Sequence, residues 1–341
     1  MNGRMDVGII GCGWAGAQHA RSYTSSQADM RLRAVCDIAE EKARGFAAEW
    51  GAESWHQDYR RLLADPKIEA VSICLPHHLH SIVAVDAAEA GKHIICEKPM
   101  ANNLQEADAM IAAAKRAEVV LMIAENVRFL PINIRISELI RDGYIGEVFL
   151  ARIFRDHEKH ETLRGSPWFL DKEKAGGGIW MSGGIHDVDA LRMLVGEVQT
   201  VALFRARSAF PEMQGDDTAA ALLKFINGAV GVVTESFSTK TFRYLYPMGC
   251  PMFLNGDLGT ITALPEGIEV YGDRMGEKPS MLRIKVDEID TFAEEIRHFA
   301  DCIRREGTPL TSGEEERKTL AVVCSGYESL SKDGIPVNVR Y

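Results

Sequence analysis

The stretch DVGIIGCGWAG at residues 6–16 joins an apolar strand pattern to a glycine-rich turn of the form G-x-G-x-x-G. In such a turn Gly11 permits the tight bend, Gly13 lets the backbone approach a pyrophosphate, and Gly16 lets the following helix pack closely on the strand. Asp37 ends the next apolar run, where a unit of this kind places the carboxylate that binds ribose hydroxyls. Strand, glycines, helix and acid in this order predict a dinucleotide-binding site.

The first 125 residues alternate between short apolar runs and helical patterns, and we expect them to form one domain. The strand-like runs lie at 7–10, 32–36, 70–75, 93–96 and 119–124. Helical patterns lie near 16–25, 39–50, 81–90 and 103–117. This alternation predicts an α/β fold, a doubly wound parallel sheet that binds its ligand at the carboxyl ends of the strands.

Residues 126–341 follow a different pattern and are expected to form a second domain. Helices are expected near 132–142, 185–195, 290–305 and 313–331, and a polar loop at 155–175. Strands are expected near 147–154, 200–207, 252–254, 260–263 and 268–271, and in a hairpin (218–226 and 229–237) that turns at Asn227-Gly228. Sequential strands with helices on one side predict an α+β domain with an open, mainly antiparallel sheet.

Composition excludes several classes of function. The 341 residues carry a net charge of −10, so no basic field for nucleic acid or an anionic membrane surface is expected. No apolar run approaches the length of a membrane span, and the glycine turn begins too early for a signal peptide to precede it, so a cytoplasmic location is expected. The seven cysteines form no C-x-x-C pair and are expected to be reduced thiols.

Two further motifs carry side chains suited to catalysis. Lys98, within Glu97-Lys98-Pro99, follows the run 93–96 and should lie at the carboxyl edge of the sheet, although a loop lysine is often only surface. Glycines at 176–178 and 183–184 surround the start of a helix that carries His186 and Asp189 in its first turns. Taken alone, this second motif also fits a packed histidine with an acid that complements the helix dipole.

Taken together, these motifs resemble the Gfo/Idh/MocA family of NAD(P)-dependent oxidoreductases. The resemblance rests on the glycine turn, PHHLH at 76–80, EKP at 97–99, RFLP at 128–131, the glycine run that leads to GIHDVD at 184–189, and LNGDLG at 254–259. It covers nearly the whole chain. It implies an N-terminal Rossmann domain that binds NAD, and a C-terminal domain whose open sheet holds the substrate pocket and the interface of a homodimer or homotetramer. The implied substrates are sugars or cyclitols.

The resemblance also implies roles for individual residues. The residues expected to contact the cofactor are Gly11, Gly13, Trp14, Ala15, Gly16, Asp37, Ile38, Leu75, Pro76, His78, His80, Glu97, Lys98, Asn126 and Trp168. Those expected to contact the substrate are Lys98, Arg128, Ser182 and His186, of which Lys98 and His186 would be catalytic.

One departure from the family pattern affects the chemistry. The family usually has D-x-G-x-H before the helix, whereas this chain has Ser182 four residues before His186. A serine can hydrogen-bond a sugar hydroxyl or cap the helix, but it cannot supply a fixed negative charge that favours an imidazolium. Both Lys98 and His186 therefore remain candidates for the proton acceptor.

Three functions fit these observations. The first is an NAD-dependent dehydrogenase, the second a glycoside-processing enzyme with tightly bound NAD, and the third a non-catalytic protein that senses a sugar or NAD. Asp37 predicts NAD rather than NADP, because its carboxylate would repel a 2′-phosphate and the next two residues supply no guanidinium. The histidine-rich segments at 77–80 and 156–161 are expected to be a cofactor segment and a charged loop, so no metal is expected.

Overall fold

The computed structural model describes residues 4–25, 29–240, 251–264, 267–272 and 280–341, and Cys250 lies outside them. The chain divides into two compact units. The first consists of Met1–Asn126 and Asp290–Arg317, and the second of Val127–Ile289 and Lys318–Tyr341. The first boundary lies one residue from the predicted one, and residues 290–317, predicted to belong to the second domain, are part of the first unit.

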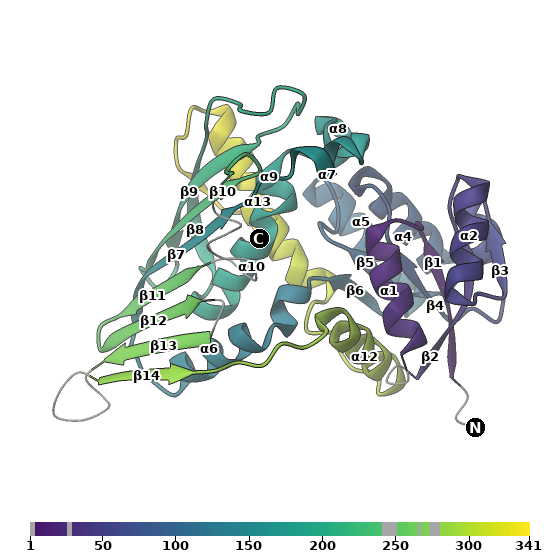
Figure 1. Ribbon diagram of the computed structural model, residues 1–341, viewed down its shortest axis with the longest axis horizontal. Coiled ribbons are helices and arrows are strands. Elements are labelled where there is room, and N and C mark those ends of the chain that lie inside the picture. Colours follow the sequence, from purple (N-terminus) through teal and green to yellow (C-terminus); the bar gives the residue numbers. More distant parts are fainter. Residues whose placement is uncertain (1–3, 26–28, 241–250, 265–266, 273–279) are drawn as a thin grey trace. The chain divides into compact units, whose positions relative to one another are not determined.

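The first unit contains a six-stranded parallel sheet in the order β3-β2-β1-β4-β5-β6 (Figure 1). Its strands are β1 (Met5–Ile10), β2 (Met30–Cys36), β3 (Ser54–His56), β4 (Ala70–Ile73), β5 (His93–Glu97) and β6 (Leu121–Ala124). The central strands β1 and β4 are buried along their whole length, as expected for strands covered by helices on both faces. Strand β3 was not predicted, because its three residues are too few and too polar to show a pattern.

Helices connect these strands and complete the unit. They are α1 (Trp14–Thr24), α2 (Glu40–Trp50), α3 (Tyr59–Leu63), α4 (His80–Glu89), α5 (Leu104–Ala117) and α12 (Thr291–Arg304). Side chains cap three of them: Asp58 accepts from Arg60 N at the start of α3, Asn103 accepts from Glu106 N, and Asp290 accepts from the backbone at the start of α12. The predicted doubly wound parallel sheet is confirmed.

The second unit is built on a nine-stranded mixed sheet in the order β14-β13-β12-β11-β7-β10-β9-β8-β15 (Figure 1). Its strands are β7 (Val148–Asp156), β8 (Val198–Arg205), β9 (Thr218–Phe225), β10 (Val230–Ser236), β11 (Met252–Gly256), β12 (Gly259–Leu264), β13 (Gly267–Gly272), β14 (Ser280–Ile284) and β15 (Val337–Asn338). β10 runs parallel to β7, and the other neighbouring pairs among these described strands are antiparallel. The predicted open, mainly antiparallel sheet is confirmed.

Helices cover one face of this sheet. The long ones are α6 (Pro131–Arg141), α10 (Gly184–Val195) and α13 (Gly313–Ser331). The stretch 155–175, predicted as a loop, contains the short helices α7 (His160–Arg164) and α8 (Lys172–Ala175), and α9 (Ile179–Ser182) follows. Strand β9 shows the two faces clearly, because alternate residues such as Leu223 are buried while Leu222 and Lys224 are exposed. None of the helices in the described residues is long and apolar enough to cross a bilayer.

The glycine run packs against the segment that leads into β9. Trp180 is fully buried, its Nε1 donates to the Val323 carbonyl at 3.1 Å, and its backbone N donates to Asp216 at 2.9 Å. A Cβ placed on Gly178 would lie 2.0 Å from the Asp216 carbonyl oxygen. Glycine is therefore required here because two backbones approach each other closely.

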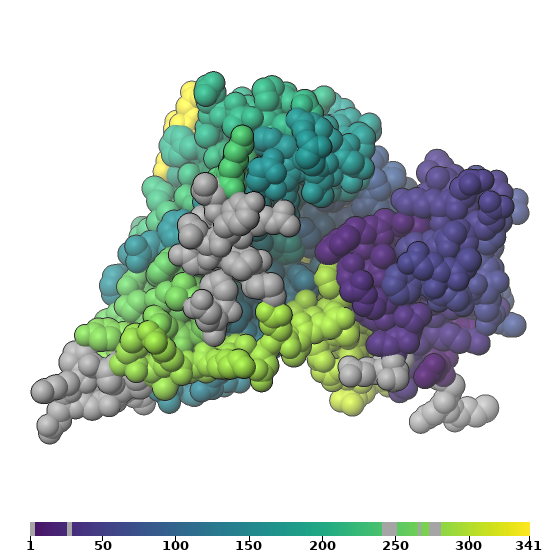
Figure 2. Space-filling model, in the orientation of Figure 1, coloured from purple at the N-terminus to yellow at the C-terminus, as the bar shows by residue number. Residues whose placement is uncertain are grey.

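We predict that Gly178→Ala lowers the free energy of unfolding by about 2 to 3 kcal/mol, because the added methyl group forces these backbones apart. Gly45→Ala is the matched control, since Gly45 lies on α2 and no atom comes within 4 Å of a Cβ placed there. The dark purple segment that contains α2 lies on the surface of the molecule (Figure 2). The Gly45→Ala change should stabilise the protein by about 0.5 to 1 kcal/mol through helix propensity. Urea unfolding measures both, and a Gly178→Ala protein as stable as wild type would contradict the packing argument.

Candidate active site

The turn between β1 and α1 has the geometry that a pyrophosphate requires. Gly11 has a φ of 104°, and a Cβ there would lie 2.1 Å from the Cys74 carbonyl oxygen. A Cβ on Gly16 would lie 2.2 Å from the Gly11 carbonyl oxygen, whereas Gly13 has no atom within 4 Å of its Cβ position. No side chain caps the N-terminus of α1. The turn thus offers open space and a helix start that no side chain of the described residues caps, which fit a dinucleotide phosphate.

Asp37 lies at the end of β2 and is held by the same turn. Its carboxylate accepts from Cys12 N at 3.1 Å and from Ala39 N at 3.0 Å. Lys42 Nζ lies 3.2 Å from Asp37 Oδ2, so one ammonium offsets part of its charge. Ile38 is 87% exposed and makes the site apolar on one side. This arrangement leaves a fixed acceptor beside the position expected for the adenosine ribose.

The loops that follow β4 and β5 are tied together by His80. Its ring nitrogens lie 2.8 Å from the carbonyl oxygens of Leu75 and Pro99, and the ring is fully buried. Burial lowers the pKa of His80, although the two carbonyl groups oppose the shift. His78 differs, because its buried Nδ1 has no hydrogen-bond partner among the described residues. His80 therefore positions the cofactor segment, while His78 has a ring nitrogen available to a ligand.

Glu97 ends β5, and Lys98 follows it at the same edge of the sheet. His19 Nε2 lies 3.3 Å from Glu97 Oε1, and the other ring nitrogen of His19 lies 2.9 Å from Ser72 Oγ. Burial raises the pKa of Glu97, but the hydrogen bond with His19 and the neighbouring Lys98 outweigh it, so the pKa lies below its usual value. The buried His19 was missed from the sequence, because a single histidine inside a helix gives no signal.

Fourteen of the fifteen predicted cofactor residues lie at the carboxyl ends of the parallel strands or in the loops and helix starts that follow them. They follow β1, β2, β4, β5 and β6, and Asn126, after β6, donates to Thr291 Oγ1 at 3.1 Å. Trp168 belongs to the second unit, where its ring stacks on Phe169 with centroids 3.9 Å apart. The structure thus gathers the predicted nucleotide residues of the first unit along one edge of its sheet.

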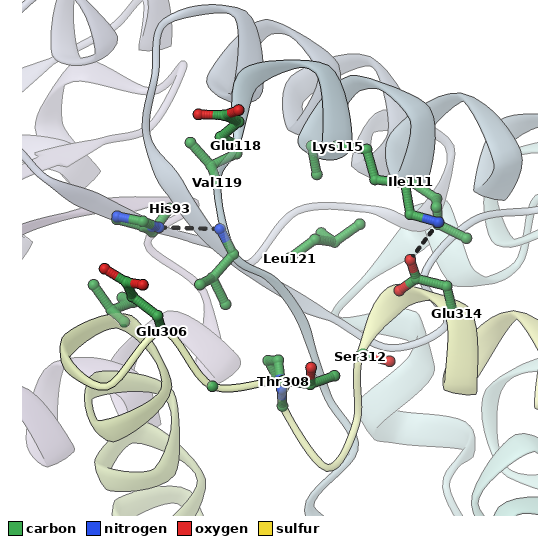
Figure 3. Close-up of a pocket in the computed structure, with 15 residues that line it drawn as sticks. His93, Ile111, Lys115, Glu118, Val119, Leu121, Glu306, Thr308, Ser312 and Glu314 are labelled. Atoms are coloured by element: carbon green, nitrogen blue, oxygen red, sulfur yellow. Dashed lines mark hydrogen bonds and ion pairs between the residues drawn. The ribbon is translucent and has the colours of Figure 1, made fainter.

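A cavity of about 680 Å³ in the first unit lies at the opposite ends of the strands. His93 begins β5, and residues 119–121 lead into β6, so this cavity borders the amino ends of the strands. Figure 3 shows Lys115 and Glu314 joined across it by an ion pair of 2.8 Å. Because dinucleotides bind at the carboxyl ends of such sheets, this cavity is separate from the nucleotide edge.

In the second unit, Ser182 and His186 lie on either side of the junction between α9 and α10. Ser182 is buried, and its Oγ donates to the Gly178 carbonyl at 3.0 Å. His186 is half-buried in the first turn of α10, and its backbone N donates to the Gly183 carbonyl at 3.0 Å. The Ser182 hydroxyl therefore forms a hydrogen bond within the glycine-rich segment. Because it is neutral, it adds no charge near His186.

Arg128 lies in a buried ion-pair network of the second unit. Its guanidinium makes a bidentate pair with Asp189, with N–O distances of 2.7 and 2.6 Å. Thr319 Oγ1 donates to the same carboxylate at 2.8 Å and accepts from Arg192 at 2.6 Å. These contacts anchor α10 to α13 and favour a positioning role for Arg128 over direct substrate contact.

The comparisons with known proteins cover nearly the whole chain. Residues 5–125 match the family model GFO/IDH/MocA, described as an oxidoreductase family with an NAD-binding Rossmann fold, and residues 134–274 match the GFO/IDH/MocA C-terminal domain. The myo-inositol 2-dehydrogenase of Thermotoga maritima is 31% identical over 96% of this chain and 97% of its own length. The D-apiose dehydrogenase of Paraburkholderia graminis is 30% identical over 99% of this chain and 90% of its own. The structure of levoglucosan dehydrogenase in complex with NADH superimposes with a TM-score of 0.88 at 26% identity, covering 98% of this chain and 99% of that one.

We predict that the protein binds NADH at least about tenfold more tightly than NADPH. A 2′-phosphate would lie against Asp37, and like charges a few ångströms apart cost several kcal/mol at an effective dielectric of about 20, of which Lys42 offsets part. Fluorescence titration of the cofactor-free protein measures both affinities. Lys42→Ala should widen the preference, and Asp37→Ser combined with Ile38→Arg should invert it. Equal or tighter binding of NADPH by the wild type would contradict the prediction.

Proposed function

Because the chain belongs to the GFO/IDH/MocA oxidoreductase family, we propose that it is an NAD-dependent dehydrogenase that oxidises a hydroxyl group of a sugar or cyclitol. The observation that carries the proposal is the carboxyl edge of the first sheet, where the glycine turn, Asp37, Glu97 and Lys98 follow successive strands. Relatives that act on myo-inositol and D-apiose support this class of substrate.

The bound NAD supplies the acceptor for the hydride, that is, for the hydrogen and the two electrons of the carbinol C–H bond. The chain's own residues hold the reactants and accept the remaining hydroxyl proton. Asp37, which is held by Cys12 N, would accept hydrogen bonds from the adenosine ribose, and the N-terminus of α1 would compensate the pyrophosphate charge. Lys98 and His186 are the proposed groups that hold or accept the hydroxyl proton.

Lys98 is suited to hold the substrate hydroxyl by its position directly after β5. Glu97 precedes it, and the lowered pKa of Glu97 keeps a carboxylate beside the lysine at neutral pH. An ammonium group at this place would donate a hydrogen bond to the reacting oxygen and take part in moving its proton. His186, half-buried at the start of α10, would contact the substrate hydroxyl.

We also propose that the chain forms a homo-oligomer through the open face of the nine-stranded sheet. The face away from the helices carries several large exposed apolar side chains, namely Phe204, Leu222, Val230, Tyr271 and Met281. Tyr271 and Met281 lie opposite each other on β13 and β14. Apolar groups on neighbouring strands of a flat face favour association, and sedimentation equilibrium gives the mass of the particle.

A cytoplasmic location is part of the proposal. Cys12 and Cys36 are buried in the first sheet, and no disulfide joins the cysteines of the described residues. Burial, with Asp37 as a smaller contribution, raises the pKa of the Cys12 thiol to about 12, which keeps it protonated and unreactive. Such thiols suit a reducing compartment.

Assays of reduced cofactor with myo-inositol, D-apiose and levoglucosan test the proposal. Net formation of NADH with one of these substrates supports a dehydrogenase. Product formation without net NADH would favour the glycoside-processing alternative with tightly bound NAD. Binding of cofactor and sugar without turnover would favour a sensing protein, the alternative to which Ser182 lends weight because it removes the usual carboxylate.

Lys98→Ala is expected to lower kcat by about a hundredfold or more, because it removes a group that takes part in proton transfer. Its affinity for NADH should stay within about tenfold of the wild-type value. Lys115→Ala is the matched control, since Lys115 lies at the amino edge of the same sheet and should leave kcat unchanged. Full activity of Lys98→Ala would remove this residue from the mechanism.

We further expect Ser182→Ala to be milder than His186→Ala, because the Ser182 hydroxyl hydrogen-bonds the Gly178 carbonyl, whereas His186 would contact the reacting hydroxyl. A loss of up to about tenfold in kcat, or about 1.4 kcal/mol, is expected for Ser182→Ala. Steady-state kinetics of the two variants measure the difference. A larger loss for Ser182→Ala than for His186→Ala would show that the serine has a chemical role.

A further inference from the structure

A carboxyl group that the sequence does not single out lies inside the second unit beside the start of α10. Glu235 is on β10, its side chain is 1% exposed, and neither carboxyl oxygen accepts a hydrogen bond from any N–H or O–H group of the described residues. A Cβ placed on Gly183 would lie 2.7 Å from Glu235 Oε2, and one on Gly184 would lie 3.2 Å from Oε1. The carboxyl group therefore packs against the glycines that precede His186.

Among the described residues, the charged neighbours of Glu235 include the carboxyl groups of Asp187 and Asp216 and the guanidinium of Arg155. Asp187, in the first turn of α10, is close enough to Glu235 that its charge and hydrogen bonding raise the pKa of Glu235. Arg155 is the register partner of Glu235 on the parallel strand β7, but its guanidinium donates to Asp187, with Nε 3.1 Å from both carboxylate oxygens. A further Arg155 nitrogen, Nη2, donates to Asp187 Oδ1. The guanidinium is thus directed to Asp187.

The charges of Glu235, Asp187 and Arg155 determine which of the two carboxyl groups carries a proton. Two carboxyl groups can hydrogen-bond each other only if one of them is protonated. Asp187 receives the Arg155 guanidinium and so holds the negative charge, which leaves the proton on Glu235. Burial and then Asp187 raise the pKa of Glu235 well above its usual value, against the opposing effect of Arg155, and Asp216 adds to the rise. Helix α10 also carries His186, Asp189 and Arg192, and the short helix α9 carries no titratable side chain.

We propose that Glu235 is a protonated positioning residue that donates a hydrogen bond to Asp187 and fixes the first turn of α10, on which His186 lies. The inference rests on the proposed function only in that it treats His186 as part of the active site. With Ser182 in place of an acid, the glycine turn gains a carboxyl group from a neighbouring strand, and this group is neutral. The net charge of Arg155, Asp187 and Glu235 is then zero beside His186.

Protonated Glu235 has a defined effect on the pH dependence of stability. Its pKa in the folded protein exceeds that in the unfolded chain, so the folded state binds more protons between these two values. The stabilisation is therefore complete below the unfolded pKa of about 4.3 and is lost progressively as the pH rises toward the folded pKa. A glutamine at this position keeps an N–H donor for Asp187 and does not ionise.

The test compares wild type, Glu235→Gln and Glu235→Leu by thermal unfolding from pH 5 to pH 8. The melting temperature of Glu235→Gln minus that of wild type should rise with pH by about 2 °C per pH unit. Glu235→Leu fills the space without a donor, and its melting temperature should lie below that of Glu235→Gln at every pH. Glu269→Gln, which replaces an exposed partner of Arg283, is the control and should show no such slope. A flat difference between Glu235→Gln and wild type would overturn the proposal.

Infrared difference spectra and kinetics add two independent readouts. At neutral pH the wild type minus Glu235→Gln spectrum should contain the carbonyl stretch of a protonated carboxylic acid, and a carboxylate band in its place would overturn the proposal. Glu235→Gln should keep kcat within about threefold, and Glu235→Leu should lose about tenfold or more; equal kcat in both variants would refute the positioning role. The melting and infrared results do not need dehydrogenase activity, so failure of the proposed function would be seen separately.

Discussion

The backbone of Gly11 passes so close to the Cys74 carbonyl that no side chain fits between them, and the nucleotide edge depends on this contact. Because Gly11 has no side chain, the backbone can turn sharply from β1, which lies between β2 and β4, into α1. Gly16 then allows α1 to pack closely against the backbone of Gly11. The N-terminus of α1 begins at this bend, the Asp37 carboxylate accepts from Cys12 N within it, and the loop after β4 packs against it through Cys74. His80 then joins that loop to the one after β5. A side chain at Gly11 would displace the strand ends together with the groups they carry.

In the second unit, buried ion pairs hold helix α10 in place. Arg128 and Thr319 hydrogen-bond Asp189 on helix α10. Arg155 hydrogen-bonds Asp187 in the first turn of the same helix. Buried ion pairs add little net stability, because the loss of hydration offsets much of the attraction between the charges. They do fix the orientation of the elements that they join. Here they fix the helix that carries His186. This gives a physical reason for the acids of the GIHDVD segment that does not require either of them to contact substrate.

The sequence predicted the parts of the fold that depend on local pattern. Apolar runs such as 93–96 and the helical period of 103–117 appear at nearly the predicted bounds, because each buries one continuous surface. The residues of the nucleotide edge followed from the strand order, since motifs after parallel strands meet at one edge. Glu235, Arg155 and His19 could not be found in this way, because their partners lie on other elements and their spacing in the sequence has no period. The packing of residues 290–317 in the first unit was not predicted, because a helix pattern in the sequence does not show which sheet the helix will cover.

The transfer of a hydride from a carbinol carbon to NAD is tested most directly by an isotope label. The protein would be incubated with NAD and myo-inositol or D-apiose that carries deuterium on every carbon-bound position, and the mass of the NADH formed would be measured. A dehydrogenase built as described here must give NADH that contains one deuterium atom from the substrate and none when only the solvent is deuterated. NADH without the label, label taken from the solvent, or a product formed with no change in the cofactor pool would contradict direct hydride transfer.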